Sequence, residues 1–217
     1  FFRLLEGPWQ KMDTISPRTH LTKINEDLVV AARDNELAIV KTLIARKADL
    51  DYGCPFTALG EAAYWGNLKI VRELAKAKAT VDYQNIWGAT ALIYATQSRR
   101  SSTVTYLVNE AKANLEVRNN QGETALATAA KHGHSSRGRG IFKFLLRAKA
   151  NVHAIDAHGS SIMELASGEL ELVKLLVGAK AQLNFANDAR EDVIDIASKN
   201  GNTASSTWLR HHRSELH

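Results

Sequence analysis

Apolar and polar residues follow a helical pattern in short blocks along this chain, with turn residues between them. In residues 57–66, small and apolar side chains recur at helical spacing behind Thr57, whose hydroxyl is suited to cap a helix N-terminus. Gly66 interrupts this pattern. A second apolar stripe predicts a helix over 68–77, and residues 80–88 predict a short extended stretch and a turn. The block therefore predicts two helices joined by a tight turn and followed by a projecting loop.

The same block recurs about every 33 residues, a period typical of repeat proteins. One marker is the second of two small residues in the first helix, found at Ala32, Ala63, Thr96, Ala130, Ala166 and Ala197. An independent marker is the alanine of a Lys-Ala pair after the second helix, found at Ala48, Ala79, Ala113, Ala150 and Ala181. One block buries too little apolar surface to be stable alone, so we expect the blocks to stack and share a continuous core.

The repeated phrase Gly-x-Thr-Ala-Leu-x-x-Ala-Ala, followed by Ile-Val-x-x-Leu-Leu-x-x-Lys-Ala, resembles the ankyrin repeat family. The resemblance implies an all-α solenoid of stacked helix-turn-helix units with projecting loops. We expect an N-terminal arm or cap over residues 1–22, five repeats over 23–183, and a degenerate sixth repeat over 184–217 that acts as a C-terminal cap. The family's usual role implies a protein–protein interaction scaffold.

The chain departs from the family pattern in two ways. Its repeats begin Thr57-Ala58-Leu59-Gly60 or similarly, where the family has Thr-Pro-Leu-His, and this favours lower stability than in arrays close to the family consensus. Lys-Ala also replaces the family's Gly-Ala after each of the first five second helices. If the backbone there is left-handed, each non-glycine residue costs about 1 kcal/mol, part of which a lysine near a helix C-terminus recovers.

In this family the loop tips and the first helices form a concave surface. Residues at the matching positions are Cys54, Phe56, Tyr64, Trp65, Ile86, Trp87, Gln97, Asn120, Gln121, Glu123, Lys131, His132 and His158. We expect the aromatic members of this set to lie side by side and to bind a partner protein, since exposed aromatics supply much of the affinity in protein interfaces. Packing of these rings on one another or on the N-terminal arm is the alternative.

The N-terminal arm carries Phe1, Phe2, Leu4, Leu5 and Trp9 and shows no repeat pattern. It is expected either to cover the open end of the stack or to dock on a partner. In the second case the chain would be a peripheral or regulatory subunit of a larger assembly, for example an organellar complex.

The fourth repeat contains an insertion that is rich in serine, glycine and arginine. Residues 131–143 hold four cations and no acid, and the sequence predicts a flexible basic loop with Arg137, Arg139 and Lys143 as anion-binding residues. A surface insertion without function is the alternative. Because no aromatic residue lies among the inserted residues 135–140, base stacking is not supported, and nucleic acid is not the expected partner.

Composition adds few constraints. The formal net charge is +5, and the single cysteine, Cys54, favours a reducing intracellular setting such as cytoplasm or an organelle lumen. The chain begins with Phe1 rather than methionine, as a processed or truncated chain would. Apolar runs are too short to cross a bilayer. The pair His132 and His134 lacks the further ligands of a zinc site, and no catalytic or nucleotide-binding motif is present, so we expect no metal, cofactor or enzymatic activity.

Overall fold

The computed structural model describes residues 20–53, 55–181 and 192–212. Over these ranges the chain forms twelve α-helices and no strand, with one isolated antiparallel bridge between Ile155 and Ser161. The helices are α1 (His20–Arg33), α2 (Leu37–Ala45), α3 (Ala58–Trp65), α4 (Leu68–Lys76), α5 (Ala91–Gln97), α6 (Ser101–Asn109), α7 (Ala125–Lys131), α8 (Ser136–Arg147), α9 (Ile162–Ala166), α10 (Leu170–Gly178), α11 (Val193–Lys199) and α12 (Thr203–His212). The prediction of an all-α solenoid is confirmed.

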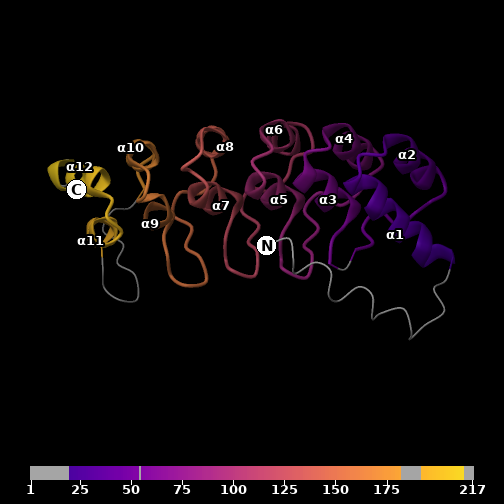
Figure 1. The fold of residues 1–217 in the computed structure, drawn as a ribbon, viewed down its shortest axis with the longest axis horizontal. Helices are drawn as coiled ribbons and strands as arrows, with labels where there is room; N and C mark the ends of the chain where they lie inside the picture. Colours follow the sequence, from indigo (N-terminus) through magenta and orange to yellow (C-terminus); the bar gives the residue numbers. More distant parts are fainter. Residues whose placement is uncertain (1–19, 54, 182–191, 213–217) are drawn as a thin grey trace.

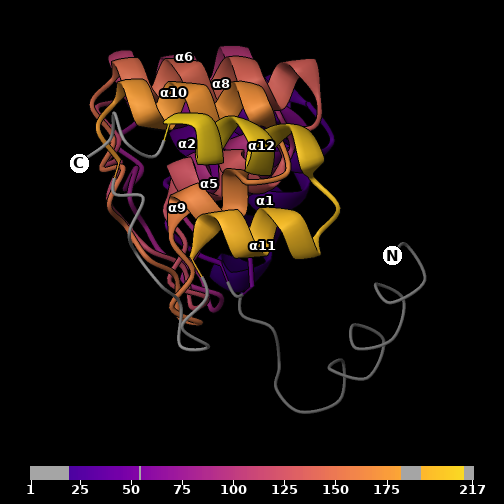
Figure 2. The same cartoon turned by 90° about the vertical axis from the view of Figure 1, so that its left-hand side faces the viewer.

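The helices lie in two rows that run the length of the stack (Figure 1). Odd-numbered helices form one row and even-numbered helices the other, and each helix packs on its neighbours in the same row and on its partner in the pair. The loops between pairs project beyond the odd-numbered row, as the view along the stack shows (Figure 2). Each pair therefore contacts only adjacent pairs, which is the one-dimensional architecture of a repeat protein.

Side-chain caps fix where the first helices begin. Thr57 Oγ1 accepts a hydrogen bond from the backbone nitrogen of Gly60 at 3.0 Å, which confirms the predicted cap. Thr90, Thr124 and Ser161 cap α5, α7 and α9 in the same way. These oxygens satisfy backbone donors that have no partner inside the helix, so each repeat starts in the same register.

Small residues let adjacent first helices approach closely. Ala62 and Ala63 in α3 are fully buried between α1 and α5, and Ala95 in α5 is fully buried as well. The apolar stripe of α4, formed by Ile70 and its neighbours Val71 and Leu74, is also fully buried. The core thus runs without a break along the stack.

The lysines that follow the second helices adopt a left-handed backbone, the case in which a cost was expected for a residue other than glycine. Their φ angles lie between 59° and 74°, at Lys47, Lys78, Lys112, Lys149 and Lys180. This conformation lets the backbone nitrogens of Lys78 and Ala79 bond to the carbonyls of Ala75 and Leu74 and close the end of α4. A lysine therefore adopts the left-handed conformation in each of these five repeats, although glycine is the residue best suited to it.

The prediction of a flexible basic loop over residues 131–143 is wrong. Residues 136–147 form α8, which has twelve residues, whereas α4 has nine, so most of the insertion lengthens a helix. Ser135 caps this helix by accepting from the backbone nitrogen of Gly138 at 3.1 Å. Gly138 is buried, and a Cβ there would lie 1.9 Å from the carbonyl oxygen of His132. The serine and glycine residues thus serve a cap and a close contact, not flexibility.

Two further observations concern the ends of the chain and the membrane. The first helix begins at His20, inside the predicted arm of 1–22, and the remainder of that arm lies outside the described residues. Helices α11 and α12 pack together and against α9 and α10, at the place predicted for the sixth repeat. No helix in the described ranges has the length and apolar character needed to cross a membrane.

Candidate functional site

Five aromatic rings from α3, α5 and the adjoining loops form a continuous row. Phe56 lies 5.0 Å from Trp87 and 5.7 Å from Tyr94, measured between ring centroids. Tyr64 lies 6.1 Å from Tyr94 and 5.5 Å from Trp65. These separations and the tilted ring planes are typical of favourable aromatic contacts. We call these five residues the aromatic row.

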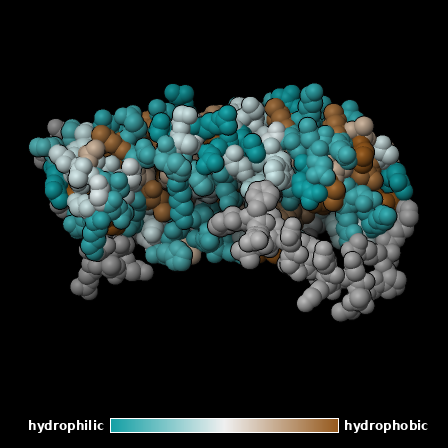
Figure 3. Space-filling view, in the orientation of Figure 1, coloured by the Kyte–Doolittle hydropathy of each residue, from teal (hydrophilic) through white to brown (hydrophobic). Residues whose placement is uncertain are grey.

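The ends of the aromatic row are exposed, whereas in its middle Phe56 is half-buried and Tyr94 is buried. The exposed fractions are 38% for Tyr64, 41% for Trp65 and 46% for Trp87, and Ile86 beside Trp87 reaches 53%. The structure thus brings together the four aromatics that the sequence singled out. The rings pack on one another, as one alternative predicted, and three of them still present apolar faces to solvent. Outside the grey residues, most of the molecular face shown in Figure 3 is hydrophilic.

Tyr94 was not identified from the sequence, although it connects both halves of the row. It is 8% exposed, and its hydroxyl accepts a hydrogen bond from the side-chain amide of Asn85 at 2.6 Å. Burial raises the pKa of Tyr94 to about 12, so the hydroxyl stays protonated at neutral pH. A usable signal was present: a large aromatic residue stands two positions before Thr96, where the other repeats have Val30, Glu61, Thr128, Glu164 and Asp195.

Glu61 holds the indole at the exposed end of the row. Trp65 Nε1 donates a hydrogen bond to Glu61 Oε2 at 3.0 Å, one helical turn away in α3. Burial of the carboxyl group raises the pKa of Glu61, and the hydrogen bond from Trp65 offsets part of that shift. The carboxylate therefore orients a ring.

Hydrogen bonds between neighbouring loop tips hold Ile86 and Trp87 in place. Asn120 donates from its backbone nitrogen to the carbonyl of Trp87 and from its side-chain amide to the carbonyl of Ile86, both at 2.9 Å. The next tip repeats part of this arrangement, since the backbone nitrogen of Ala157 donates to the carbonyl of Gln121 at 2.8 Å. The tips are thereby joined to one another across three repeats.

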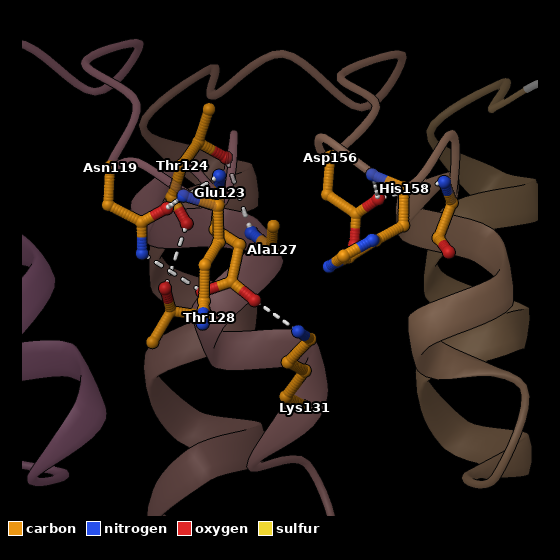
Figure 4. A network of polar contacts seen from close by, with 10 residues as sticks. Asn119, Glu123, Thr124, Ala127, Thr128, Lys131, Asp156 and His158 are labelled. Atoms are coloured by element: carbon orange, nitrogen blue, oxygen red, sulfur yellow. Dashed lines mark hydrogen bonds and ion pairs between the residues drawn. The ribbon is translucent and has the colours of Figure 1, made fainter. Parts of the chain in front are cut away.

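An aspartate or asparagine shapes each of these tips from within. Asn85, Asn119 and Asp156 each accept, through Oδ1, two backbone hydrogen bonds from residues two and four positions later. In the third of these tips one donor is the backbone nitrogen of His158 (Figure 4), which is exposed at the surface. This arrangement fixes the backbone that presents the predicted surface residues.

Glu123 differs from its predicted role as a surface contact. It is 6% exposed, forms an ion pair with Lys131, and accepts a hydrogen bond from the side-chain amide of Asn119 at 3.0 Å (Figure 4). Its carboxylate is therefore used inside the repeat and positions the Lys131 ammonium group. Lys131 itself keeps 40% of its side chain exposed, and Gln97, Asn120 and Gln121 are exposed.

The predicted anion-binding residues lie on α8 rather than on a loop. Arg139 lies 3.7 Å from the Glu169 carboxylate and donates to the backbone carbonyls of Gly133 and His134. Lys143 is half-buried, and Arg137 is exposed. Because Lys131 and Arg139 both have acidic partners, two of the four cations in the segment are compensated.

The two neighbouring histidines do not form a metal site with other ligands. The rings of His132 and His134 lie 6.3 Å apart. Burial lowers the pKa of His132, and the charges of Arg99 and His134 lower it further. Within the ranges that the structure describes, no group of three or more His, Cys, Asp or Glu side chains could hold a metal ion. Cys54 lies outside those ranges.

Comparison with known proteins supports the repeat pattern. A model of the family described as ankyrin repeats (3 copies) matches residues 28–119, and a single ankyrin repeat model matches residues 121–157. Over 162 residues the chain is 30% identical to ankyrin repeat and SAM domain-containing protein 6 of Danio rerio, covering 72% of this chain and 22% of that protein. Over 130 residues it is 27% identical to Rabankyrin-5 of Mus musculus, covering 59% of this chain and 11% of that protein. The chain thus matches under a quarter of either relative's length.

Proposed function

Because this chain belongs to the ankyrin repeat family, whose repeats generally serve as protein–protein interaction modules, we propose that it binds a partner protein through the aromatic row and the loop tips beside it. The observation that carries the proposal is the contiguous exposure of Tyr64, Trp65, Ile86 and Trp87 on a hydrogen-bonded frame. Large rings held in place before binding lose little conformational entropy when a partner covers them. The protein contributes rigid presentation and no chemistry of its own.

The surface beside the aromatic row is polar and suits the rim of an interface. Going along the stack from the row, the exposed predicted contacts are Gln97, Asn120, Gln121, Lys131 and His158, with His132 half-buried among them. These side chains can form hydrogen bonds and adjust the association rate, whereas the rings supply most of the affinity. The partner should therefore place apolar side chains over α3 and the tip at Trp87, and polar ones over α7.

The test is affinity capture of the native partner, followed by direct binding measurements with purified partner. The Trp65→Ala/Trp87→Ala double variant should lose at least a hundredfold in affinity, since each ring is expected to contribute about 1.4 kcal/mol or more, and each 1.4 kcal/mol is tenfold in affinity. Trp208→Ala is the matched control, because Trp208 lies on α12 at the far end of the stack and stacks on His212. Circular dichroism would establish that all three proteins are folded.

Unchanged affinity in the double variant would overturn this proposal. The same assay tests the alternative hypothesis that the ligand is an anionic polymer. Polymer binding would fall steeply between low and physiological salt and would depend on Arg137, Arg139 and Lys143 rather than on the tryptophans. We expect instead a weak salt response, since at Lys131 and Arg139 the charge is already compensated by Glu123 and Glu169.

A further inference from the structure

Ile39 is exposed at a position that every later repeat buries. It begins the Ile-Val-x-x-Leu pattern of the second helix in the first repeat. The residues at the same position in the other second helices are 0% to 2% exposed: Ile70, Thr103, Ile141, Leu172 and Ser205. Ile39 is 45% exposed. In the later repeats the preceding helix pair covers this position, and α2 has no such pair before it among the described residues (Figure 1).

A second residue on the same end face differs from most of its equivalents. Val30 in α1 is 44% exposed, whereas Tyr94, Thr128 and Glu164 at the same position are 5% to 9% exposed and Glu61 is half-buried; only Asp195, in the last described helix pair, is also exposed. Val30 and Ile39 border a groove of about 500 Å³ between α1 and α2, whose floor includes the buried residues Ala31 and Leu43. An apolar groove of this kind at the end of a repeat stack requires a cover.

We propose that residues 1–19 of this chain cover the groove, with the apolar run that begins at Phe1 seated over Val30 and Ile39. The segment joins directly to α1, which forms one wall of the groove, so its effective concentration there is in the millimolar range or above. Residues 1–9 hold Phe1, Phe2, Leu4, Leu5 and Trp9. A nine-residue helix such as α2 is about 13 Å long, and nine residues suffice to match it.

Charge favours this occupant over a second copy of the chain. Asp27 and Glu36 line the groove together with Arg46. Residues 1–19 contain three basic residues, Arg3, Lys11 and Arg18, and two acidic residues, Glu6 and Asp13. A symmetric dimer through this face would instead place the Asp27 and Glu36 of two chains near one another, and like charges at an interface are unfavourable. The proposal is independent of the function proposed above, because the groove and the aromatic row are different surfaces.

The test measures how fast a thiol in the groove reacts. In the full chain with Cys54→Ser, Ala38→Cys places the thiol on the groove wall. We expect it to react with a maleimide at least tenfold more slowly than in the same protein with Phe1, Phe2, Leu4 and Leu5 changed to serine. Lys76→Cys, at an exposed site on α4, is the matched control and should react equally fast in both backgrounds. Circular dichroism at the labelling temperature checks that both proteins are folded.

A second measurement covers the case in which the serine variant does not fold. With Leu5→Cys and Ala38→Cys in the Cys54→Ser chain, mild oxidation should give a disulfide within one chain, seen as a monomer on a non-reducing gel and located by peptide mass spectrometry. Equal labelling rates in the two folded backgrounds would overturn the proposal. Disulfide formation only between chains would also overturn it, because it would indicate a dimer. A labelling rate at the Ala38→Cys thiol that falls with protein concentration, and does not change with the serine substitutions, would do the same.

Discussion

The indole nitrogen of Trp65 donates a hydrogen bond to the carboxylate of Glu61, with 3.0 Å between Nε1 and Oε2. The two residues lie one turn apart in α3, where the apolar character of the surroundings raises the pKa of Glu61. Burial thus disfavours the charged form of a group that supports the proposed binding surface, at some expense of stability, which is common at functional sites.

Glu61→Gln should therefore stabilise the protein in a pH-dependent manner. A carboxyl whose pKa is higher in the folded state contributes most to stability when protonated, and that contribution is lost as the pH rises through the raised value. The gain in melting temperature from Glu61→Gln should be largest at neutral pH and disappear below about pH 4. Thermal denaturation across this range measures it, with the exposed Glu171→Gln as control. A gain independent of pH would contradict the assignment.

Thr96→Val should raise the free energy of unfolding by about 1 kcal/mol. Thr96 is 1% exposed, and its hydroxyl has no hydrogen-bond partner within the part of the chain that the structure describes. The same change at Thr128, whose hydroxyl donates to the carbonyl of Thr124 at 3.1 Å, should lower that free energy by about 1 kcal/mol. Urea denaturation compares the two variants, and equal signs would show that hydrogen bonding does not control stability at these positions.

Two lysines at the end of α4 should respond in opposite directions to replacement by glycine. Lys78 has a φ of 74°, and Lys78→Gly should raise the free energy of unfolding by up to about 1 kcal/mol. Lys76 is the last residue of the helix, and Lys76→Gly should lower it by about 0.5 to 1 kcal/mol. Chemical denaturation of both variants checks the difference, and a loss on Lys78→Gly would mean that the lysine's interaction with the helix end outweighs the backbone strain.

Asn120→Ala should loosen the tip that carries Ile86 and Trp87. The change removes the 2.9 Å hydrogen bond from the Asn120 amide to the carbonyl of Ile86. Hydrogen exchange should become faster over residues 85–89, and affinity for the partner should fall by about three- to tenfold, since one such bond is worth roughly 1 kcal/mol. Gln121→Ala is the neighbouring control for the exchange measurement, because the exposed Gln121 uses only its backbone in the contacts between tips.

Much of the fold was predictable because each repeat encodes it locally. The helix predicted over 68–77 ends one residue earlier in the structure, Thr57 caps α3, and the lysines after the second helices are left-handed. These features depend on residues a few positions apart. The error over residues 131–143 has a local cause as well: serine and glycine near Ser135 suggested flexibility, but they form a cap and a close contact that a sequence pattern does not distinguish from a loop.

The candidate site was less predictable because its contacts cross between repeats. Tyr94 meets Phe56 and Tyr64 from the preceding repeat, and this depends on how far successive first helices are rotated and shifted. The ion pair of the buried Glu123 with Lys131 lies within one repeat, but it joins residues eight positions apart that face one another only once α7 has formed. The position of a residue in the repeat predicted whether it belongs to the surface. Which of these residues are exposed and which support the others became clear only from the packing of the repeats in the structure.

Phe56 belongs to one repeat, and its ring neighbours Trp87 and Tyr94 belong to the next. Neither unit could display the row on its own, so the surface exists only while α3 and α5 remain docked. If the first two helix pairs detached from the stack, the ring contacts of the aromatic row would be lost before the rest of the molecule unfolded. A ligand bound to the aromatic row would in turn stabilise the packing of α3 on α5. Binding and the stability of this end of the array are therefore thermodynamically linked.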